Sequence, residues 1–139
     1  MGLKVKKLSE KAIVPTKNLP SDAGIDLYVP ESITIPANSR ALIKTNIAMA
    51  IPEGFCGLVT GRSGNTIKRG LVGQLGIVDS HYRGDVGIMA FNTTSEDITI
   101  ESGERVGQIV IVPFLSVQPE ECDELDETDR KGGFGSSGK

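Results

Sequence analysis

The hydrophobic and polar positions of this chain fall into short runs, and each run ends at a cluster of turn-forming residues. Runs of Val, Ile, Leu and Thr at this spacing, separated by Gly, Pro and Asn, predict the strands of a β-sandwich or barrel. The predicted strands cover residues 33–35, 41–51, 55–60, 71–72, 75–78, 86–91, 98–100 and 106–112. We therefore expect an all-β fold.

The stretch 63–69 is the best candidate for a helix. Ser63 could supply the N-cap, and Gly70 is placed to end the helix. Arg62, Ser63 and Gly64 would then lie at the helix start, where backbone N–H groups, a cation and a hydroxyl favour an anion. Simple capping by Ser63 is the alternative.

The last twenty residues differ from the rest. Acidic side chains dominate residues 120–129, and a Gly-rich end follows. We expect one domain over 1–119 and a mobile tail over 120–139. Composition alone favours an ordinary tail, but a ring among glycines with a cation and hydroxyls could also clamp a base and its phosphates. Those tail residues are Arg130, Phe134, Gly135, Ser136 and Ser137.

Composition narrows the class of protein. The 139 residues suit one domain, and a net charge of −3 argues against stable nucleic acid binding, which needs a basic face. The start of the chain lacks a signal-peptide pattern, and no apolar run is long enough to span a membrane. We expect an intracellular, cytoplasmic protein. Cys56 is expected to be buried and Cys122 to be an exposed tail thiol.

Three further segments could carry chemistry. Asp22 and Asp26 flank a Gly turn, and they either cap backbone N–H groups or lie near a hard cation such as Mg²⁺. Asp79 ends an apolar run, a placement that suits a general base, although a turn-initiating role is the simpler reading. Gln108 could bridge to a ligand through water or satisfy backbone groups at a strand end.

In their order and content, these segments resemble the homotrimeric deoxyuridine triphosphate nucleotidohydrolase (dUTPase) family. The resemblance runs from the segment Ala23-Gly24-Ile25-Asp26-Leu27 to the Gly-Phe-Gly-Ser tail, nearly the whole chain. It implies a distorted jelly roll of the β-clip type with one short helix. It also implies a homotrimer with shared active sites, in which the tail closes over bound nucleotide.

The resemblance implies hydrolysis of dUTP to dUMP and pyrophosphate, by water attacking the α-phosphorus with Mg²⁺ bound. Asp79 matches the water-activating carboxylate. Arg62, Ser63 and Gly64 match the phosphate-binding motif, and Gln108 matches a residue that contacts phosphates or their waters. Asp26 matches a residue that supports the metal, indirectly through water. In the tail, Phe134 would stack over uracil, while Arg130, Gly135, Ser136 and Ser137 would hold the β- and γ-phosphates.

Specificity is implied in the same way. Tyr82 matches an aromatic residue that packs against the deoxyribose and leaves no room for a 2′-hydroxyl. Uracil is expected in a hairpin whose backbone groups reject cytosine, because the opposite hydrogen-bonding edge would leave buried groups unpaired. Gly87, on the next strand, would let the backbone approach the base. The expected hairpin residues are Gly73, Gln74, Ile77 and Val78.

Two other functions compete with this one. A deoxycytidine triphosphate deaminase shares a similar fold but needs a carboxylate aimed at the base, and the Asp79…Tyr82 arrangement fits phosphate chemistry better. A non-catalytic jelly-roll module would be expected to have lost Asp79, Arg62 or the Gly-Phe-Gly tail, and all three are present.

Overall fold

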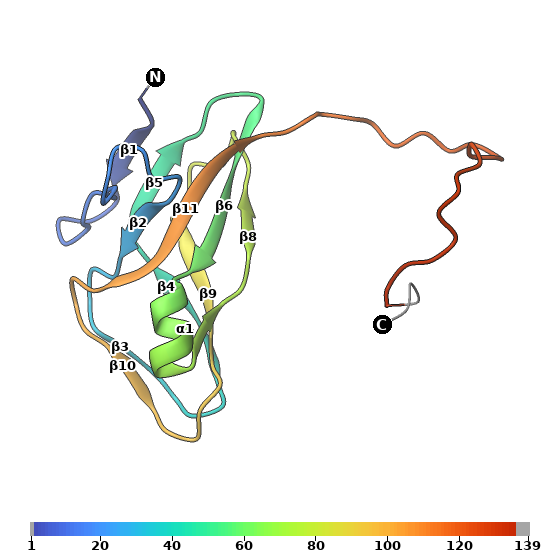
Figure 1. The fold of residues 1–139 in the computed structure, drawn as a ribbon. Helices are drawn as coiled ribbons and strands as arrows, with labels where there is room; N and C mark the ends of the chain where they lie inside the picture. The colour runs from blue at the N-terminus through green and yellow to red at the C-terminus, as the bar shows by residue number, and fades with distance from the viewer. Residues whose placement is uncertain (1, 136–139) are drawn as a thin grey trace.

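The computed structural model describes residues 2–135, and its regular elements are almost all strands (Figure 1). This confirms the all-β prediction. In chain order the elements are β1 (Lys4–Lys7), β2 (Ile25–Tyr28), β3 (Ile33–Ile35), β4 (Arg40–Lys44), β5 (Ile47–Ala50), β6 (Phe55–Gly61), α1 (Ser63–Arg69), β7 (Leu71–Gly73), β8 (Gly76–Val78), β9 (Gly87–Asn92), β10 (Ile98–Ile100) and β11 (Arg105–Pro113).

Two main sheets enclose the core. One has the strand order β2-β11-β6-β8 and the other β4-β9-β7, and two-stranded sheets β1-β5 and β10-β3 complete the barrel. All pairs are antiparallel. Side chains alternate inward along β9, as the pleat requires. The core joins both sheets through fully buried residues such as Ile109, Val59, Ile88 and Ile43.

The predicted strand over 41–51 is two strands. The chain turns at Asn46, whose φ of 57° lies in the left-handed region that Asn tolerates better than most residues. An Asp85 carboxylate oxygen fixes this turn by accepting hydrogen bonds from the N–H groups of Thr45 (3.2 Å) and Asn46 (2.9 Å). The break is needed because β4 pairs with β9, whereas β5 pairs with β1.

The prediction of a hairpin around Gly73, Gln74, Ile77 and Val78 is wrong. Strand β7 pairs with β9 and β8 pairs with β6, so the two strands belong to different sheets. Gly73 of β7 instead lies backbone to backbone against Gly61 of β6. A Cβ on Gly61 would lie 2.8 Å from the Gly73 nitrogen, so this crossing of the sheets requires glycine.

Helix α1 has the predicted bounds but not the predicted cap. Arg62 is the N-cap residue, and no side chain caps the helix start, so the capping role expected of Ser63 is wrong. Gly70 ends the helix as predicted, with a φ of 68° and its N–H bonded to the Thr66 carbonyl.

The last turn of α1 is tied to the loop before β11. The Arg69 guanidinium donates to the Glu104 carboxylate (2.7 Å) and to the Thr99 carbonyl (2.6 Å). The pKa of the Glu104 carboxyl is lowered, first by a hydrogen bond from the Glu101 backbone N–H and then by Arg69. These contacts hold the C-terminal end of α1 against β10 and the loop before β11.

Strands β1 and β2 were not predicted. The sequence around β2 reads as a turn because Asp22, Gly24 and Asp26 interrupt its apolar pattern. After β11 the chain runs away from the barrel as an extended segment (Figure 1). Cys56 is buried and Cys122 exposed, as predicted. Among residues 2–135, no helix has the length and hydropathy needed to cross a membrane.

Candidate functional site

Three neighbouring strands bring distant polar residues to one end of the larger sheet. In the register of this sheet, Gln108 of β11 lies between Asp26 of β2 and Thr60 of β6. Arg62 follows the end of β6, so the sheet order β2-β11-β6 assembles three of the predicted segments. They line a polar pocket of about 530 Å³, whose lining residues are Asn18, Asp22, Gly24, Asp26, Arg62, Ser63, Gly64, Lys68, Arg105 and Gln108.

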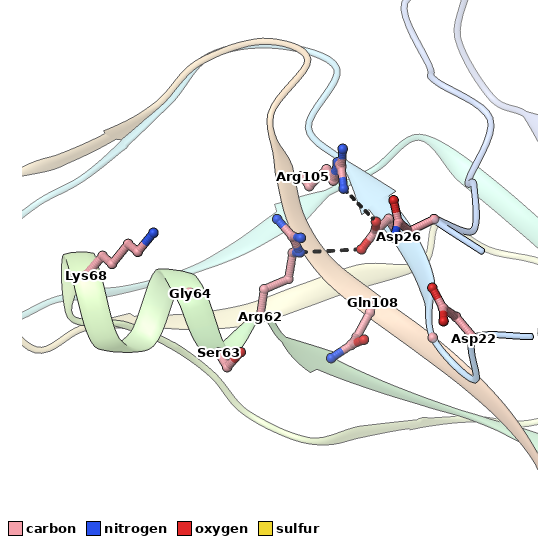
Figure 2. A pocket seen from close by; sticks show the side chains of 10 residues that line it. Asp22, Asp26, Arg62, Ser63, Gly64, Lys68, Arg105 and Gln108 are labelled. Carbon is pink, nitrogen blue, oxygen red and sulfur yellow. Dashed lines mark hydrogen bonds and ion pairs between the residues drawn. The ribbon is translucent and has the colours of Figure 1, made fainter.

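Asp26 joins two guanidinium groups in this polar pocket. Its Oδ1 lies 3.4 Å from Arg62 Nε, and its Oδ2 lies 3.3 Å from Arg105 NH1 (Figure 2). Only 14% of the Asp26 side chain is exposed, against 38% for Arg62 and 45% for Arg105. The carboxylate thus holds both cations from beneath while their outer N–H groups remain open to a ligand.

Close backbone contact also shapes the polar pocket. A Cβ on Gly24 would collide with the Gln108 side-chain oxygen, so glycine leaves room for that amide in the polar pocket. No atom lies within 4 Å of the place where a Cβ on Gly64 would stand. Lys68, one helical turn beyond Gly64, adds a third cation to the rim. The pocket therefore suits a polyanion.

Asp22 plays a different part from Asp26. Its Oδ2 accepts a hydrogen bond from the Leu19 N–H (2.9 Å), which is the turn-capping role that the sequence offered as the simpler reading. The two carboxylates of this segment therefore divide between turn formation and the ion pairs of the polar pocket.

A second pocket, of about 280 Å³, lies along β8 and the loop that follows it. It is mostly apolar, and its polar edge carries Asp79 and Tyr82. The Tyr82 hydroxyl donates to the Asp85 carbonyl (2.9 Å), and the ring lies so close to Gly84 that a Cβ there would collide with it. We call it the apolar pocket; it is lined by Leu42, Val59, Gly76, Ile77, Val78, Asp79, Tyr82, Asp85, Val86, Gly87 and Met89.

The two pockets are separated along β6. Val78, just before Asp79, pairs with Gly57 near the start of β6, whereas Arg62 follows Gly61 at its end. At about 3.3 Å per residue, four residues of strand place these groups more than ~13 Å apart. Within one chain, Asp79 therefore does not lie next to Arg62.

The remaining predicted residues lie elsewhere. Gln74 borders a separate pocket of about 470 Å³ with Met89 and Phe91, and its N–H donates to the Met89 carbonyl (2.8 Å). Gly73 is taken up by its contact with Gly61. In the tail, Arg130 Nε donates to the Gly132 carbonyl and the Phe134 side chain is fully exposed. Gly135 has a φ of 90°. Ser136 and Ser137 lie outside the described residues.

Sequence reasoning missed Arg105 as a pocket residue. Arg105 and Gln108 are three positions apart, so strict alternation would direct them to opposite faces of β11. A register shift between Arg105 and Gly107 changes this and brings both to the polar pocket. Gly107 within the strand was the only signal, because glycine in a strand often marks a bulge.

The ligands that the described residues offer a metal are few. Between residues 2 and 135, no three His, Cys, Asp or Glu side chains gather as a metal-binding cluster. Asp26 is bound to two guanidinium groups, and Gln108 adds one amide oxygen. This donor set fits an ion that brings most of its ligands with it, as Mg²⁺ does on a nucleotide.

Comparison with known proteins agrees with this geometry. A family model described as dUTPase matches residues 10–138. The deoxyuridine 5'-triphosphate nucleotidohydrolase of Arabidopsis thaliana is 42% identical over 136 residues, which cover 97% of this chain and 82% of that protein.

Two solved structures have the same fold. The dUTPase of Staphylococcus bacteriophage 80alpha with dUPNHPP superposes with a TM-score of 0.92 at 34% identity, covering 99% of this chain and 98% of that one. A mutant dUTPase of the S. aureus phage phi11, described with a coordinated structural Mg(II) ion, gives 0.84 at 31% identity, covering 89% and 98%. The chain belongs to the dUTPase family of hydrolases.

Proposed function

We propose that the chain hydrolyses dUTP to dUMP and pyrophosphate, by attack of water on the α-phosphorus. The observation that carries this proposal is the polar pocket, where three cations surround a space large enough for a triphosphate. All three lie within the residues that the dUTPase family model matches. In the cell this reaction would limit uracil incorporation into DNA and supply dUMP for dTMP synthesis.

Asp79 acts as the general base. It accepts a proton from the attacking water while the water oxygen bonds to the α-phosphorus. The bond from that phosphorus to the bridging α,β-oxygen breaks, and pyrophosphate leaves with the electron pair. A positioned base of this kind contributes about 10²–10⁴-fold to the rate. The exposed position of Asp79, at the end of β8 and the edge of the apolar pocket, supports this role.

The triphosphate is held by the polar pocket. Arg62, Ser63 and Gly64 supply a guanidinium, a hydroxyl and backbone N–H groups, and Gln108 contacts phosphate oxygens directly or through water. Arg105 and Lys68 extend this set. Because Asp26 fixes both guanidinium groups before substrate arrives, little reorganisation is needed on binding.

Magnesium is the cofactor of this reaction. Mg²⁺ held by the triphosphate oxygens would neutralise charge on the phosphates and orient them. Asp26 would support the metal through its water shell, because both carboxylate oxygens already face guanidinium groups. The structural Mg(II) ion of the phi11 relative is consistent with magnesium use in the family.

The nucleoside is bound by the apolar pocket. Ile77, Val78 and Gly87 line a space that suits a pyrimidine and its sugar, and Tyr82 stands at its edge. The Tyr82 ring, held by its hydroxyl at Asp85, excludes a 2′-hydroxyl and so favours deoxyribose. Gly73 and Gln74 contribute to the uracil site only if the substrate spans the β7–β8 connection.

The complete site is shared between chains of a homotrimer. The separation of Asp79 from Arg62 along β6 supports this proposal, because one nucleotide must reach both groups. The tail, which runs away from its own barrel, closes a site of the assembly. Phe134 stacks on uracil, and Arg130, Gly135, Ser136 and Ser137 hold the outer phosphates.

Pyrophosphate release from dUTP, dCTP, dTTP and UTP, each with and without Mg²⁺, tests the function. We expect turnover of dUTP alone, and only with Mg²⁺. Release of ammonia from dCTP would indicate the deaminase chemistry of the same fold. Comparable rates on all four substrates would contradict the proposed uracil and deoxyribose selection.

A further inference from the structure

A groove along β1 combines cations with an apolar floor. Lys4 and Lys6 are exposed and two positions apart, so they point to the same side of β1. Arg83, from the loop after β8, adds a third cation. We call this the β1 groove; it measures about 300 Å³ and is lined by Lys4, Val5, Lys6, Leu8, Ala48, Met49, Ala50 and Arg83.

The positive charge of the β1 groove is not neutralised within the chain. Over residues 2–135, the ion pairs include none of Lys4, Lys6 and Arg83. The Arg83 guanidinium donates only to uncharged carbonyls, those of Ser80 and Tyr82. No Asp or Glu lines the groove, whereas the polar pocket contains Asp22 and Asp26. The β1 groove is therefore the better site for a carboxylate-rich ligand.

A ligand of this kind exists in the chain itself. Residues 120–129, the acidic segment, carry seven carboxylates and no cation, and Leu125 stands at their centre. The Leu125 side chain is 84% exposed. The body, residues 1–119, carries twelve basic and eleven acidic side chains, so the negative net charge of the protein resides in its last twenty residues.

We propose that the acidic segment of one chain docks in the β1 groove of a second copy. Its carboxylates would pair with Lys4, Lys6 and Arg83, while Leu125 covers an apolar floor. That floor is made by the exposed Leu8 and by Ala48 and Ala50, which pair with Lys6 and Lys4 on the same side of the sheet. One apolar side chain flanked by carboxylates matches an apolar floor flanked by cations. Each exposed ion pair is weak, but several act together once the copies are held in one assembly.

Two observations favour a second copy over the same chain. Residues 115–129 form no hydrogen bond or ion pair with the body in the described structure, and the segment leaves the barrel directly (Figure 1). The residues before the acidic segment also leave apolar side chains uncovered: Phe114 is 47%, Leu115 84% and Val117 67% exposed. A neighbouring surface would cover these side chains and the acidic segment together.

This inference goes beyond the proposed reaction and gives the linker a role of its own. Docking would fix the start of residues 130–135 on a neighbouring subunit, so that less chain has to be ordered when the tail closes. The contact should weaken steeply with salt, because its charges are exposed.

The thiol of Cys122 allows a direct measurement, because the other cysteine, Cys56, is buried. A fluorophore on Cys122 of the full-length protein should show restricted rotation at low salt and free rotation at 1 M NaCl. The variant Lys4→Glu/Lys6→Glu should lose the restriction at low salt, and adding Asp123→Lys/Glu124→Lys should restore it. Free rotation of the fluorophore at low salt in the labelled protein without substitutions would overturn the proposal.

The matched control is Lys7→Glu/Lys44→Glu, which makes the same charge change at exposed positions outside the β1 groove. It should leave the restriction in place, and an equal loss would show that net charge alone is responsible. A short thiol-to-amine cross-linker from Cys122 should yield covalent oligomers, whereas cross-links only within one chain would overturn docking on a second copy. Light scattering on the same samples reports the assembly, and no readout depends on turnover.

Discussion

Asp79 and Arg62 lie at opposite ends of β6, separated by the length of the strand that joins Gly57 to Gly61. If each active site takes Asp79 from one subunit and Arg62 from another, two inactive variants should complement each other. Random mixing of Asp79→Asn and Arg62→Ala chains in a cyclic trimer should leave about a quarter of the sites intact. Steady-state dUTP turnover after co-refolding measures this, and turnover no higher than that of either variant alone would mean that each site is built within one chain.

The Asp79→Asn variant should bind nucleotide but turn it over about 10²–10⁴-fold more slowly, because the amide accepts no proton from water at neutral pH. Steady-state turnover of dUTP measures the loss of rate, and titration with dUPNHPP measures nucleotide binding separately. The Asp85→Asn variant is a useful contrast, since that carboxylate holds the Asn46 turn and should affect stability more than chemistry. Undiminished turnover would remove Asp79 from the mechanism.

Tyr82→Ala should raise the activity on UTP relative to dUTP, because this variant lacks the ring that we propose excludes the 2′-hydroxyl. A change of about 10–100-fold in the ratio of kcat/KM values is expected from the size of such contacts. Tyr82→Phe loses only the hydrogen bond to the Asp85 carbonyl, so it should keep most of the discrimination. An unchanged ratio in Tyr82→Ala would assign sugar selection to another group.

Deleting residues 130–139 should leave a folded protein with little activity. The body makes its core without these residues, so the thermal midpoint should not fall. Phe134→Ala in the full chain isolates the proposed stacking contribution, since this side chain is fully exposed and its loss cannot disturb packing. Full activity of the deletion variant would return the tail to an ordinary chain end.

Glu104 gives a pH-dependent prediction. Its pKa is lowered in the folded protein, so the stability it contributes is present above the unfolded value of about 4.3 and is lost as pH falls through the folded value. Glu104→Gln should therefore lower Tm at pH 7, and its difference from the wild type should shrink below about pH 4. A constant difference from pH 7 to pH 3 would contradict this account. Partial exposure keeps the effect small.

Apart from β1 and β2, the strand positions could be predicted because their apolar runs are bounded by Gly, Pro and Asn. Helix α1 could be predicted because Gly70 marks its end. What the sequence could not supply was which strand pairs with which. The hairpin over residues 73–78 failed for that reason: β7 and β8 are adjacent in sequence but belong to different sheets. The local pattern of apolar residues does not show that β8 pairs with β6 and β7 with β9, because these partners are not neighbours in the sequence.

The same limit applies to the candidate site. Asp26, Arg62 and Gln108 were chosen one segment at a time, and the strand order β2-β11-β6 explains why they meet. Arg105 was missed because a bulge in β11 overrides the alternation of side chains. The division into two pockets could not be predicted either. It follows because β8 runs antiparallel to β6, which places Asp79 near the start of β6 and not near Arg62 at its end.

The placement of Asp79 and Arg62 at opposite ends of one strand has a genetic consequence. If sites are shared as proposed, a single chain that carries defects at both positions disables two sites of its trimer, although two of the three subunits are normal. Co-expressed with the wild-type gene, such an allele should act as a dominant inhibitor, whereas an allele with either defect alone would disable one site per defective chain. The length of one strand thus determines how many active sites a mutant chain inactivates in trimers that it forms with wild-type chains.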